Sequence, residues 1–177
     1  MLDKLIEFII QIIDRIMPLY IVKQYQQAVF FRAGKFRSIK DPGLHWKIPL
    51  LDDVDTFVVV TTTLTLPAQS ATTKDGLGVV AKAVVKYKIV NLQIFAIEVW
   101  DQIDALSDTI CGIILSEIEQ YTWEDGRKTD MDSIVSKKAR AEVKKWGIHV
   151  ESVTFTDLSQ MRSIRLFNES APNFSNT

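Results

Sequence analysis

The stretch that organises this chain is residues 25–53, which read YQQAVFFRAGKFRSIKDPGLHWKIPLLDD. Its first part, Tyr25–Arg32, is rich in aromatic and β-branched residues and predicts a strand. Gly34 supplies the turn that reverses this strand, and a basic stretch leads to a second turn at the Asp-Pro-Gly of residues 41–43. Leu44–Ile48 is then a short apolar segment. These residues predict the opening of an antiparallel sheet, around which the rest of the chain folds.

Length and composition allow one domain, or two small domains packed closely together. The chain has 177 residues, a formal net charge of -1 at pH 7 and a single cysteine, Cys111. A nearly neutral chain lacks the basic footprint of a general nucleic-acid binder, so we expect no nucleic-acid partner. A single cysteine also excludes a disulfide within the chain.

Residues 1–19 predict an amphipathic helix with an unusually wide apolar face. On a helix with about 100° per residue, the polar positions fall within about one third of the circumference. They are Asp3, Lys4, Glu7, Gln11, Asp14, Arg15 and Pro18. The apolar side chains fill the rest of the circumference and are the candidates for membrane insertion: Leu2, Leu5, Ile6, Phe8, Ile9, Ile10, Ile12, Ile13, Ile16 and Met17.

This helix is a poor secretory signal and a poor transmembrane span. Charges interrupt its apolar run, and no small-residue cleavage site follows it. The segment before Pro18 would be about 25 Å long, shorter than a hydrocarbon core of ~30 Å. Lying in the membrane interface with the apolar face down avoids burying the charges. The alternative is that the helix packs on its own domain or on neighbouring subunits.

Two features close to this helix offer further points of membrane contact. Four basic residues surround the first turn, and they either form a solvated loop or contact anionic headgroups. They are Arg32, Lys35, Arg37 and Lys40. The apolar segment after the second turn presents Leu44 and Trp46, which either belong to the core or dip into the headgroup layer.

The rest of the chain alternates between strand and helix patterns. The expected elements are strands at 20–32, 54–66 and 79–90, helices at 91–99, 101–121 and 130–146, and a strand from 148. The strand at 79–90 alternates strictly, as a half-buried antiparallel strand does. Trp123–Gly126 is expected to close the second helix, Thr129 or Asp130 to cap the third, and a β-bulge is expected near Glu151. Residues 158–177 are expected to form a short helix and a frayed tail.

The order of turns and apolar residues in the opening stretch resembles the start of the SPFH domain, also called Band 7, of stomatins, prohibitins and flotillins. The matching positions are Arg32-Ala33-Gly34, Asp41-Pro42-Gly43-Leu44, Trp46, Pro49 and Asp52 or Asp53. Asp41 stands where the family usually has a glycine. A second, independent match is Trp146-Gly147-Ile148, followed by valines and the acidic Asp157. The resemblance therefore covers about residues 20–157.

The resemblance implies an α+β fold. An N-terminal amphipathic helix (1–19) precedes an antiparallel sheet subdomain (about 20–95) and a helix-containing α/β subdomain (96–157). It also implies a homo-oligomer, peripheral or monotopic on the cytoplasmic face of a membrane, that organises membrane proteins and restrains membrane proteases. Family members continue into a long helical region that drives ring assembly, whereas this sequence ends at Thr177, so the expectation is a short form without that coiled coil.

No catalytic, metal or cofactor motif is visible. His45 and His149 lie far apart, and neither has a ligand at metal-binding spacing. Cys111 is expected to sit within a helix as a small apolar filler. Because no nucleophile elbow, phosphate loop or zinc motif is found, we expect no enzyme, no cofactor and no metal.

Two functions remain open. The first is a membrane-associated scaffold that oligomerises on one membrane face and organises or regulates membrane proteins, a membrane protease among them. The second is a soluble regulator that binds a partner protein through the apolar N-terminal helix. Such a regulator would join or interfere with a larger SPFH assembly.

Overall fold

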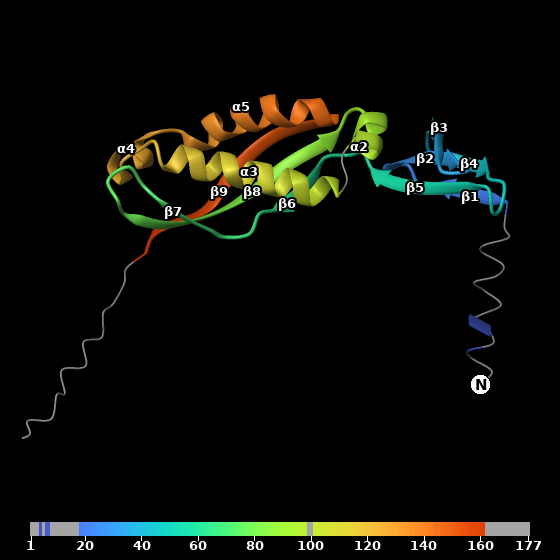
Figure 1. Cartoon of the computed structure of the whole chain (residues 1–177), viewed down its shortest axis with the longest axis horizontal. Helices are drawn as coiled ribbons and strands as arrows, with labels where there is room; N and C mark the ends of the chain where they lie inside the picture. The colour runs from blue at the N-terminus through green and yellow to red at the C-terminus, as the bar shows by residue number, and fades with distance from the viewer. Residues whose placement is uncertain (1–3, 5, 8–17, 99–100, 162–177) are drawn as a thin grey trace, which may run out of the picture.

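A small β-rich subdomain and a larger α/β subdomain lie end to end in the computed structural model (Figure 1). The structure describes residues 4, 6–7, 18–98 and 101–161. Of the expected N-terminal helix, Lys4, Ile6 and Glu7 are helical and exposed, and the remaining positions up to residue 17 lie outside the described residues. The mixed α+β class expected from the sequence is confirmed.

The small subdomain contains two antiparallel sheets. A three-stranded sheet has the order β3-β2-β5, and a two-stranded ribbon pairs β1 with β4. The strands are β1 (Leu19–Val22), β2 (Gln26–Arg32), β3 (Lys35–Lys40), β4 (Gly43–Trp46) and β5 (Asp52–Val58). The ribbon packs on the sheet through a small buried cluster of Val22, Ala28 and Phe30.

The larger subdomain is a four-stranded sheet with helices packed on it. Strand β8 is central, with β9 on one side and both β6 and β7 on the other. The strands are β6 (Thr62–Thr65), β7 (Gln69–Thr72), β8 (Gly78–Ile89) and β9 (Ile148–Gln160). The helices are α2 (Leu92–Glu98), α3 (Gln102–Ile118), α4 (Trp123–Lys128), α5 (Met131–Val143) and the short 3-10 helix η1 (Lys144–Trp146). Helices α3 and α5 lie side by side on one face of this sheet (Figure 1).

The main core lies between this sheet and the helices α3 and α5. Strand β8 contributes alternate residues: Val79, Ala81, Ala83, Val85 and Tyr87. This confirms the half-buried strand expected from the alternation, with Lys82 and Lys86 exposed on the other face. The helices contribute buried residues at helical spacing, among them Leu106, Ile110, Ile114, Val135, Ala139 and Val143. The rings of Phe57 on β5 and Phe95 on α2 meet edge-on at 5.6 Å between centroids and connect the two subdomains.

Two expected strands are each divided in the structure. The strand predicted over 20–32 is two strands, because the chain turns where the N–H of Gln26 donates to the carbonyl of Lys23 (3.0 Å). The strand predicted over 54–66 stops at Val58 and resumes as β6 in a different sheet. Strands β6 to β8 thus share a sheet with β9, whereas the sequence placed them with the first subdomain.

The helical region follows the prediction except at one junction. Residues Trp123–Gly126 were expected to close a helix, but they open α4, because the Thr122 hydroxyl accepts from the N–H of Asp125 (3.2 Å) and caps its first turn. The cap expected for the next helix is confirmed. The carboxylate of Asp130 accepts from the N–H of Ser133 (3.2 Å) at the start of α5.

The start of the last strand agrees with the prediction from the sequence, whereas its end does not. Gly147 ends the helical region in the left-handed conformation, with a φ of 73°. The expected bulge is confirmed. Val150 pairs with Tyr87 and Ser152 with Lys86, so Glu151 between them is an extra residue without a partner on β8. The short helix expected from Leu158 does not begin there. Leu158 instead lies in β9, where it pairs with Ala81 of β8 and packs against the main core.

Candidate functional site

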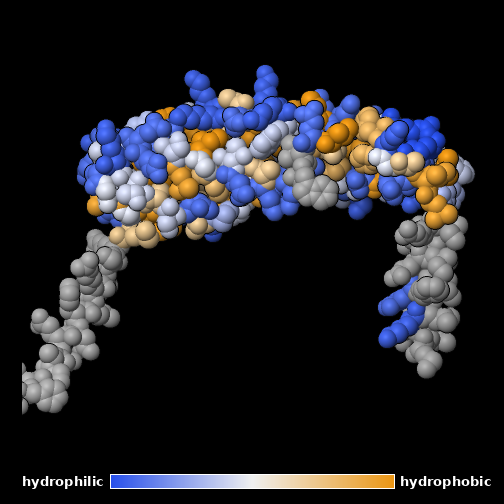
Figure 2. Space-filling model, in the orientation of Figure 1, coloured by the Kyte–Doolittle hydropathy of each residue, from blue (hydrophilic) through white to orange (hydrophobic). Residues whose placement is uncertain are grey.

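One face of the β1–β4 ribbon is apolar and open to solvent. The register pairs Leu19 with Trp46 and Ile21 with Leu44, and because side chains alternate along a strand, all four share one face. Ile21 is 69% exposed, Leu44 61% and Trp46 74%. We call these four side chains the apolar ribbon face. Figure 2 shows apolar side chains gathered at this end of the molecule.

Aromatic contacts fix the opposite face of the ribbon to the three-stranded sheet. Tyr20 and His45 meet Phe30 edge-on, with ring centroids 6.2 Å and 6.4 Å from that of Phe30. Val22 is buried beside them. A ring nitrogen of His45 also lies 2.7 Å from the carbonyl oxygen of Asp41. These contacts hold the ribbon in one orientation, with the apolar ribbon face outward.

The loop that follows β4 extends this apolar surface. Residues 47–51, which we call the apolar loop, carry three exposed side chains: Ile48, Leu50 and Leu51. Leu50 is 89% exposed, and its φ of 72° lies in the left-handed region that leucine rarely adopts. The N–H of Lys47 donates to the carbonyl of Pro18 (2.7 Å), just before β1. The apolar loop is therefore held beside the ribbon.

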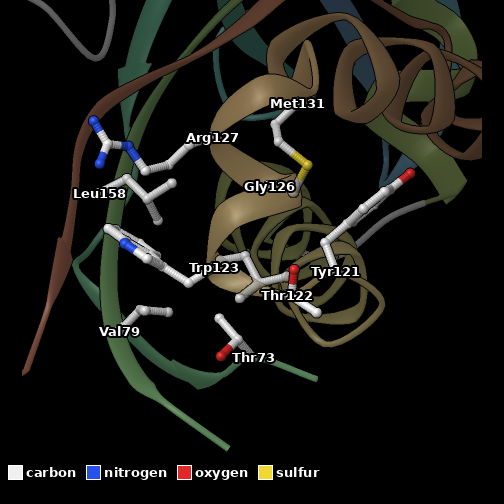
Figure 3. Close-up of a pocket in the computed structure, with 10 residues that line it drawn as sticks. Thr73, Val79, Tyr121, Thr122, Trp123, Gly126, Arg127, Met131 and Leu158 are labelled. Atoms are coloured by element: carbon white, nitrogen blue, oxygen red, sulfur yellow. The ribbon is translucent and has the colours of Figure 1, made fainter. Parts of the chain in front are cut away.

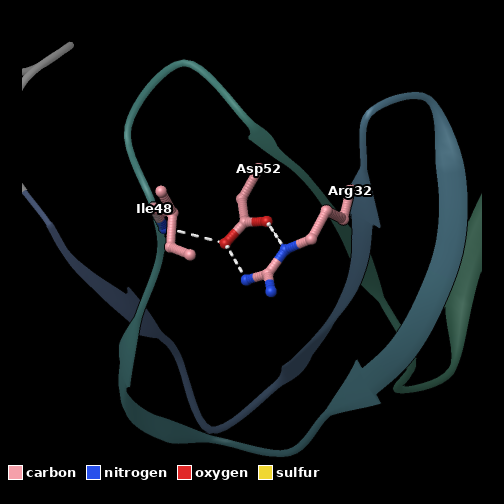
Figure 4. Close-up of polar contacts among 3 residues, drawn as sticks. All are labelled: Arg32, Ile48 and Asp52. Atoms are coloured by element: carbon pink, nitrogen blue, oxygen red, sulfur yellow. Dashed lines mark hydrogen bonds and ion pairs between the residues drawn. The ribbon is translucent and has the colours of Figure 1, made fainter.

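An ion pair closes the base of the apolar loop (Figure 4). The guanidinium of Arg32 donates to both carboxylate oxygens of Asp52, from Nε at 2.6 Å and from Nη2 at 2.9 Å. The N–H of Ile48 donates to the same carboxylate at 2.7 Å. These donors, Arg32 first, lower the pKa of Asp52 from 3.8 to about 2. The ionised carboxylate of Asp52, at the end of the loop, thus binds Ile48 near its start and Arg32 on β2.

The four basic residues predicted to contact headgroups have different environments. The Arg32 guanidinium already has an anionic partner in Asp52. The ammonium of Lys40 lies 6.0 Å from the ring centroid of Phe30. Lys35 and Arg37 are exposed on β3, an outer strand of the three-stranded sheet. Lys35 and Arg37 therefore lie at the edge of the three-stranded sheet and are not part of the apolar ribbon face.

A small apolar cavity of about 20 Å³ lies near α4, at the other end of the molecule (Figure 3). Its lining includes Val79, Tyr121, Trp123, Met131 and Leu158. This volume has room for about one water molecule. Beside it, the carboxylate of Asp75 accepts from the Thr73 hydroxyl, which lowers the pKa of Asp75, and from the N–H of Trp123 (3.4 Å). The cavity is a packing junction between a loop and α4.

The remaining reactive side chains do not gather into a site within the part of the chain that the structure describes. No group of three or more His, Cys, Asp or Glu residues there is placed to hold a metal ion. Cys111 lies buried in α3, where burial raises the pKa of its thiol. Among the same residues, none of the helices has the length and apolar character needed to cross a membrane.

The family model of the SPFH domain, or Band 7 family, matches residues 20–165. The chain belongs to this family. The match includes both larger sheets, all of α2 to α5 and the ribbon except Leu19. It confirms the resemblance seen in the opening stretch and at Trp146-Gly147-Ile148.

Similar proteins come from archaea and animals. A protein of Archaeoglobus fulgidus is 29% identical over 155 residues, which cover 82% of this SPFH chain and 59% of the relative. A stomatin homologue of Pyrococcus horikoshii is 28% identical over 140 residues, which cover 78% and 53%. Stomatin-1 of Caenorhabditis elegans is 29% identical over 154 residues, which cover 82% and 46%. This SPFH chain therefore spans about half the length of these relatives.

Sequence reasoning found Leu44 and Trp46 but missed the rest of the exposed surface. Leu19 was assigned to the N-terminal helix and Ile21 to the strand leading to Arg32, because nothing local shows that β1 pairs with β4. A signal was available, since Leu19 and Ile21 alternate with Tyr20 just as Leu44 and Trp46 alternate with His45.

Proposed function

We propose that this SPFH protein is a membrane-associated scaffold whose small subdomain docks onto lipid. The apolar ribbon face and the apolar loop carry this proposal. They form one exposed apolar surface, fixed from behind, at the end of the molecule where the predicted amphipathic helix leads into β1. A large exposed apolar patch on a soluble protein usually marks a contact with a protein or a membrane.

The strength of this contact can be bounded. Burying one large apolar side chain contributes about 1.5–3 kcal/mol. Partial insertion of Ile21, Leu44 and Trp46 would therefore contribute several kcal/mol to the binding free energy. The translational and rotational entropy lost on binding opposes this contribution. A dissociation constant of 1 mM already corresponds to about 4 kcal/mol. One subdomain alone would bind weakly, and firm binding requires the N-terminal helix, several linked copies, or both.

The proposed scaffold is a non-catalytic homo-oligomer on the cytoplasmic face of a membrane. Multiple weak lipid contacts on one oligomer add up to firm attachment, while the outward faces remain available to neighbouring proteins. The clients in this proposal are membrane proteins, with a membrane protease among them. This part of the proposal rests on what the SPFH family resemblance implies and on the exposed surface described above.

The alternative function is a soluble regulator that joins or interferes with a larger SPFH assembly through its apolar N-terminal helix, and it would bury the neighbouring apolar ribbon face against protein. Both functions bury the apolar ribbon face, so its exposure alone does not separate them. Trp46 favours lipid, because an exposed tryptophan beside aliphatic side chains suits the boundary between headgroups and acyl chains.

Flotation with liposomes tests the proposal. The full chain should rise with vesicles at neutral pH, and Leu44→Ser combined with Trp46→Ser should leave a larger fraction at the bottom of the gradient. Ile97→Ser is the matched control, because Ile97 is an exposed apolar residue on α2, away from the ribbon. A full chain that stays at the bottom would exclude the membrane function, and a double variant that floats like the control would exclude the apolar ribbon face as the docking surface.

A further inference from the structure

Helix α5 covers part of the outer edge of β9 with side chains. Three residues spaced four apart on one helix face reach this edge: Asp132, Ser136 and Arg140. Arg140 Nε donates to the carbonyl of Val150 (2.7 Å), and its Nη2 donates to that of Glu151. Ser136 Oγ accepts from the N–H of Val153 (2.7 Å), and Asp132 Oδ1 accepts from the N–H of Phe155 (3.1 Å). Side chains of α5 thus meet the outer backbone groups of β9 from the carbonyl of Val150 to the N–H of Phe155.

Beyond Phe155 this cover ends, because Asp132 lies in the first turn of α5. The N–H of Met161 donates to the carbonyl of Gly78 on β8 (2.9 Å). Since alternate residues of an antiparallel strand point their backbone groups to opposite sides, Leu158 and Gln160 point theirs away from β8. Among the described residues, no donor or acceptor meets these outward groups.

This uncovered edge lacks lysine and proline, and its one charged residue is Asp157. Exposed edge strands are commonly blocked by lysine, proline or a covering element. Residues 157–161 read Asp-Leu-Ser-Gln-Met, with neither lysine nor proline. A surface groove of about 300 Å³, lined by Arg127, Met131 and Leu158 among others, runs beside the edge, and Figure 3 shows Leu158 next to α4. The surroundings leave room for another strand.

We propose that residues 157–161 of β9 pair antiparallel with the same residues of a second copy, about a two-fold axis at Ser159. In this register Leu158 faces Gln160 of the partner subunit, so all the outward backbone groups of both residues are used. Ser159 faces Ser159 of the partner subunit, and Asp157 faces Met161 of the partner subunit. Among the described residues, a register shifted by one residue pairs fewer outward groups. No like charges oppose each other in this register, so electrostatic repulsion does not disfavour the pairing, and both copies use the same residues.

The dimer deepens the assembly part of the proposed function. A two-fold axis of this kind runs perpendicular to the sheet, so the four-stranded sheets of two copies join and their helices stay on the same face. The ribbon lies at the end of the molecule opposite the end of β9 (Figure 1). The dimer would therefore carry its two apolar ribbon faces at opposite ends and on the same side of the joined sheet.

A single introduced cysteine at the axis tests this pairing in the full chain. Cys111, the only native cysteine, is replaced by alanine, and Ser159→Cys is added. Two Ser159 Cα atoms at the axis would lie about 4.5–5.5 Å apart, within the ~4.4–6.8 Å that a disulfide spans. Diamide should convert this variant to a covalent dimer in mild detergent. In the matched control Thr154→Cys, an exposed position on the same strand, the thiols would lie ~33 Å apart and should couple at least tenfold more slowly.

A second variant separates edge pairing from random collision. Gln160→Pro removes an N–H that points away from β8 and places a ring on the outer edge, whereas Gln160→Ala keeps that N–H. In the Ser159→Cys background, Gln160→Pro should slow coupling at least tenfold with an unchanged far-UV circular dichroism spectrum, and Gln160→Ala should not. Equal coupling of Ser159→Cys and Thr154→Cys, or fast coupling with Gln160→Pro, would overturn the proposal. Flotation of the uncoupled protein reports separately on the membrane function, so either proposal can fail alone.

Discussion

At the scale of single residues, one carboxylate determines how the exposed loop is presented. Asp52 accepts from Arg32 and from the N–H of Ile48, and so connects the start of the apolar loop to β2. Leu50, between these anchors, is held exposed and in a left-handed conformation. Backbone of that kind persists where the surrounding structure over-determines it. The ion pair therefore supports the apolar surface without being part of it.

Replacing Asp52 by asparagine should make stability less sensitive to acid. Folding lowers the pKa of Asp52 from 3.8 to about 2. The ionised carboxylate therefore favours the folded state above pH ~4, and this contribution is lost as the pH falls from about 4 to about 2. The urea midpoint of the wild type should drop over this range by more than that of Asp52→Asn. Asp53→Asn, at the exposed next residue, should follow the wild type, and identical pH profiles for Asp52→Asn and wild type would contradict the expectation.

Gly147→Ala should destabilise the fold more than Gly34→Ala does. Both glycines have a positive φ, 73° and 75°, so both substitutions carry backbone strain of about 1–3 kcal/mol. At Gly147 a Cβ would also meet the carbonyl oxygen of Asn91 at 2.3 Å, whereas at Gly34 nothing lies within 4 Å. Urea denaturation measures both variants against the wild type. Equal losses would show that the contact with Asn91 relaxes without cost.

At the scale of elements, the local sequence predicted what depends on local pattern and missed what depends on long-range pairing. The alternation of β8, the Asp130 cap and the turn at Gly147 each depend on neighbouring residues, and each was confirmed. The pairing of β1 with β4 brings together residues about 25 positions apart, and no local pattern specifies it. The candidate surface was therefore only half predicted, through Leu44 and Trp46.

Ser136→Ala should destabilise the packing of α5 on β9. The Ser136 hydroxyl accepts from the N–H of Val153 (2.7 Å) and donates to its carbonyl (3.3 Å), and the side chain is buried. Leaving buried backbone groups without a partner costs about 1–3 kcal/mol. Ser133→Ala, at an exposed position of the same helix, should change stability little or slightly increase it, because alanine favours helix. Matching denaturation midpoints for the two variants would show that water replaces the hydroxyl.

At the scale of the whole molecule, the two exposed features lie at opposite ends. The apolar ribbon face and apolar loop occupy the tip of the small subdomain, and the uncovered edge of β9 lies at the far end of the larger one (Figure 1). Between them the β8–β9 ladder and the helices form one packed body. A contact at one end can therefore set the spacing and direction of the contact at the other.

This separation predicts that assembly strengthens membrane binding without altering the lipid-contacting surface. A dimer that has inserted one apolar ribbon face holds the second close to the membrane, and linking two weak sites in this way raises overall binding by about 10²–10⁴. Gln160→Pro, which leaves Leu44 and Trp46 intact, should therefore bind vesicles at least tenfold more weakly than the wild type, measured by flotation across a range of protein concentrations. Gln160→Ala should bind like the wild type. If Gln160→Pro is monomeric and still floats as well as the wild type, a single tip suffices for membrane binding and dimerisation has no role in it.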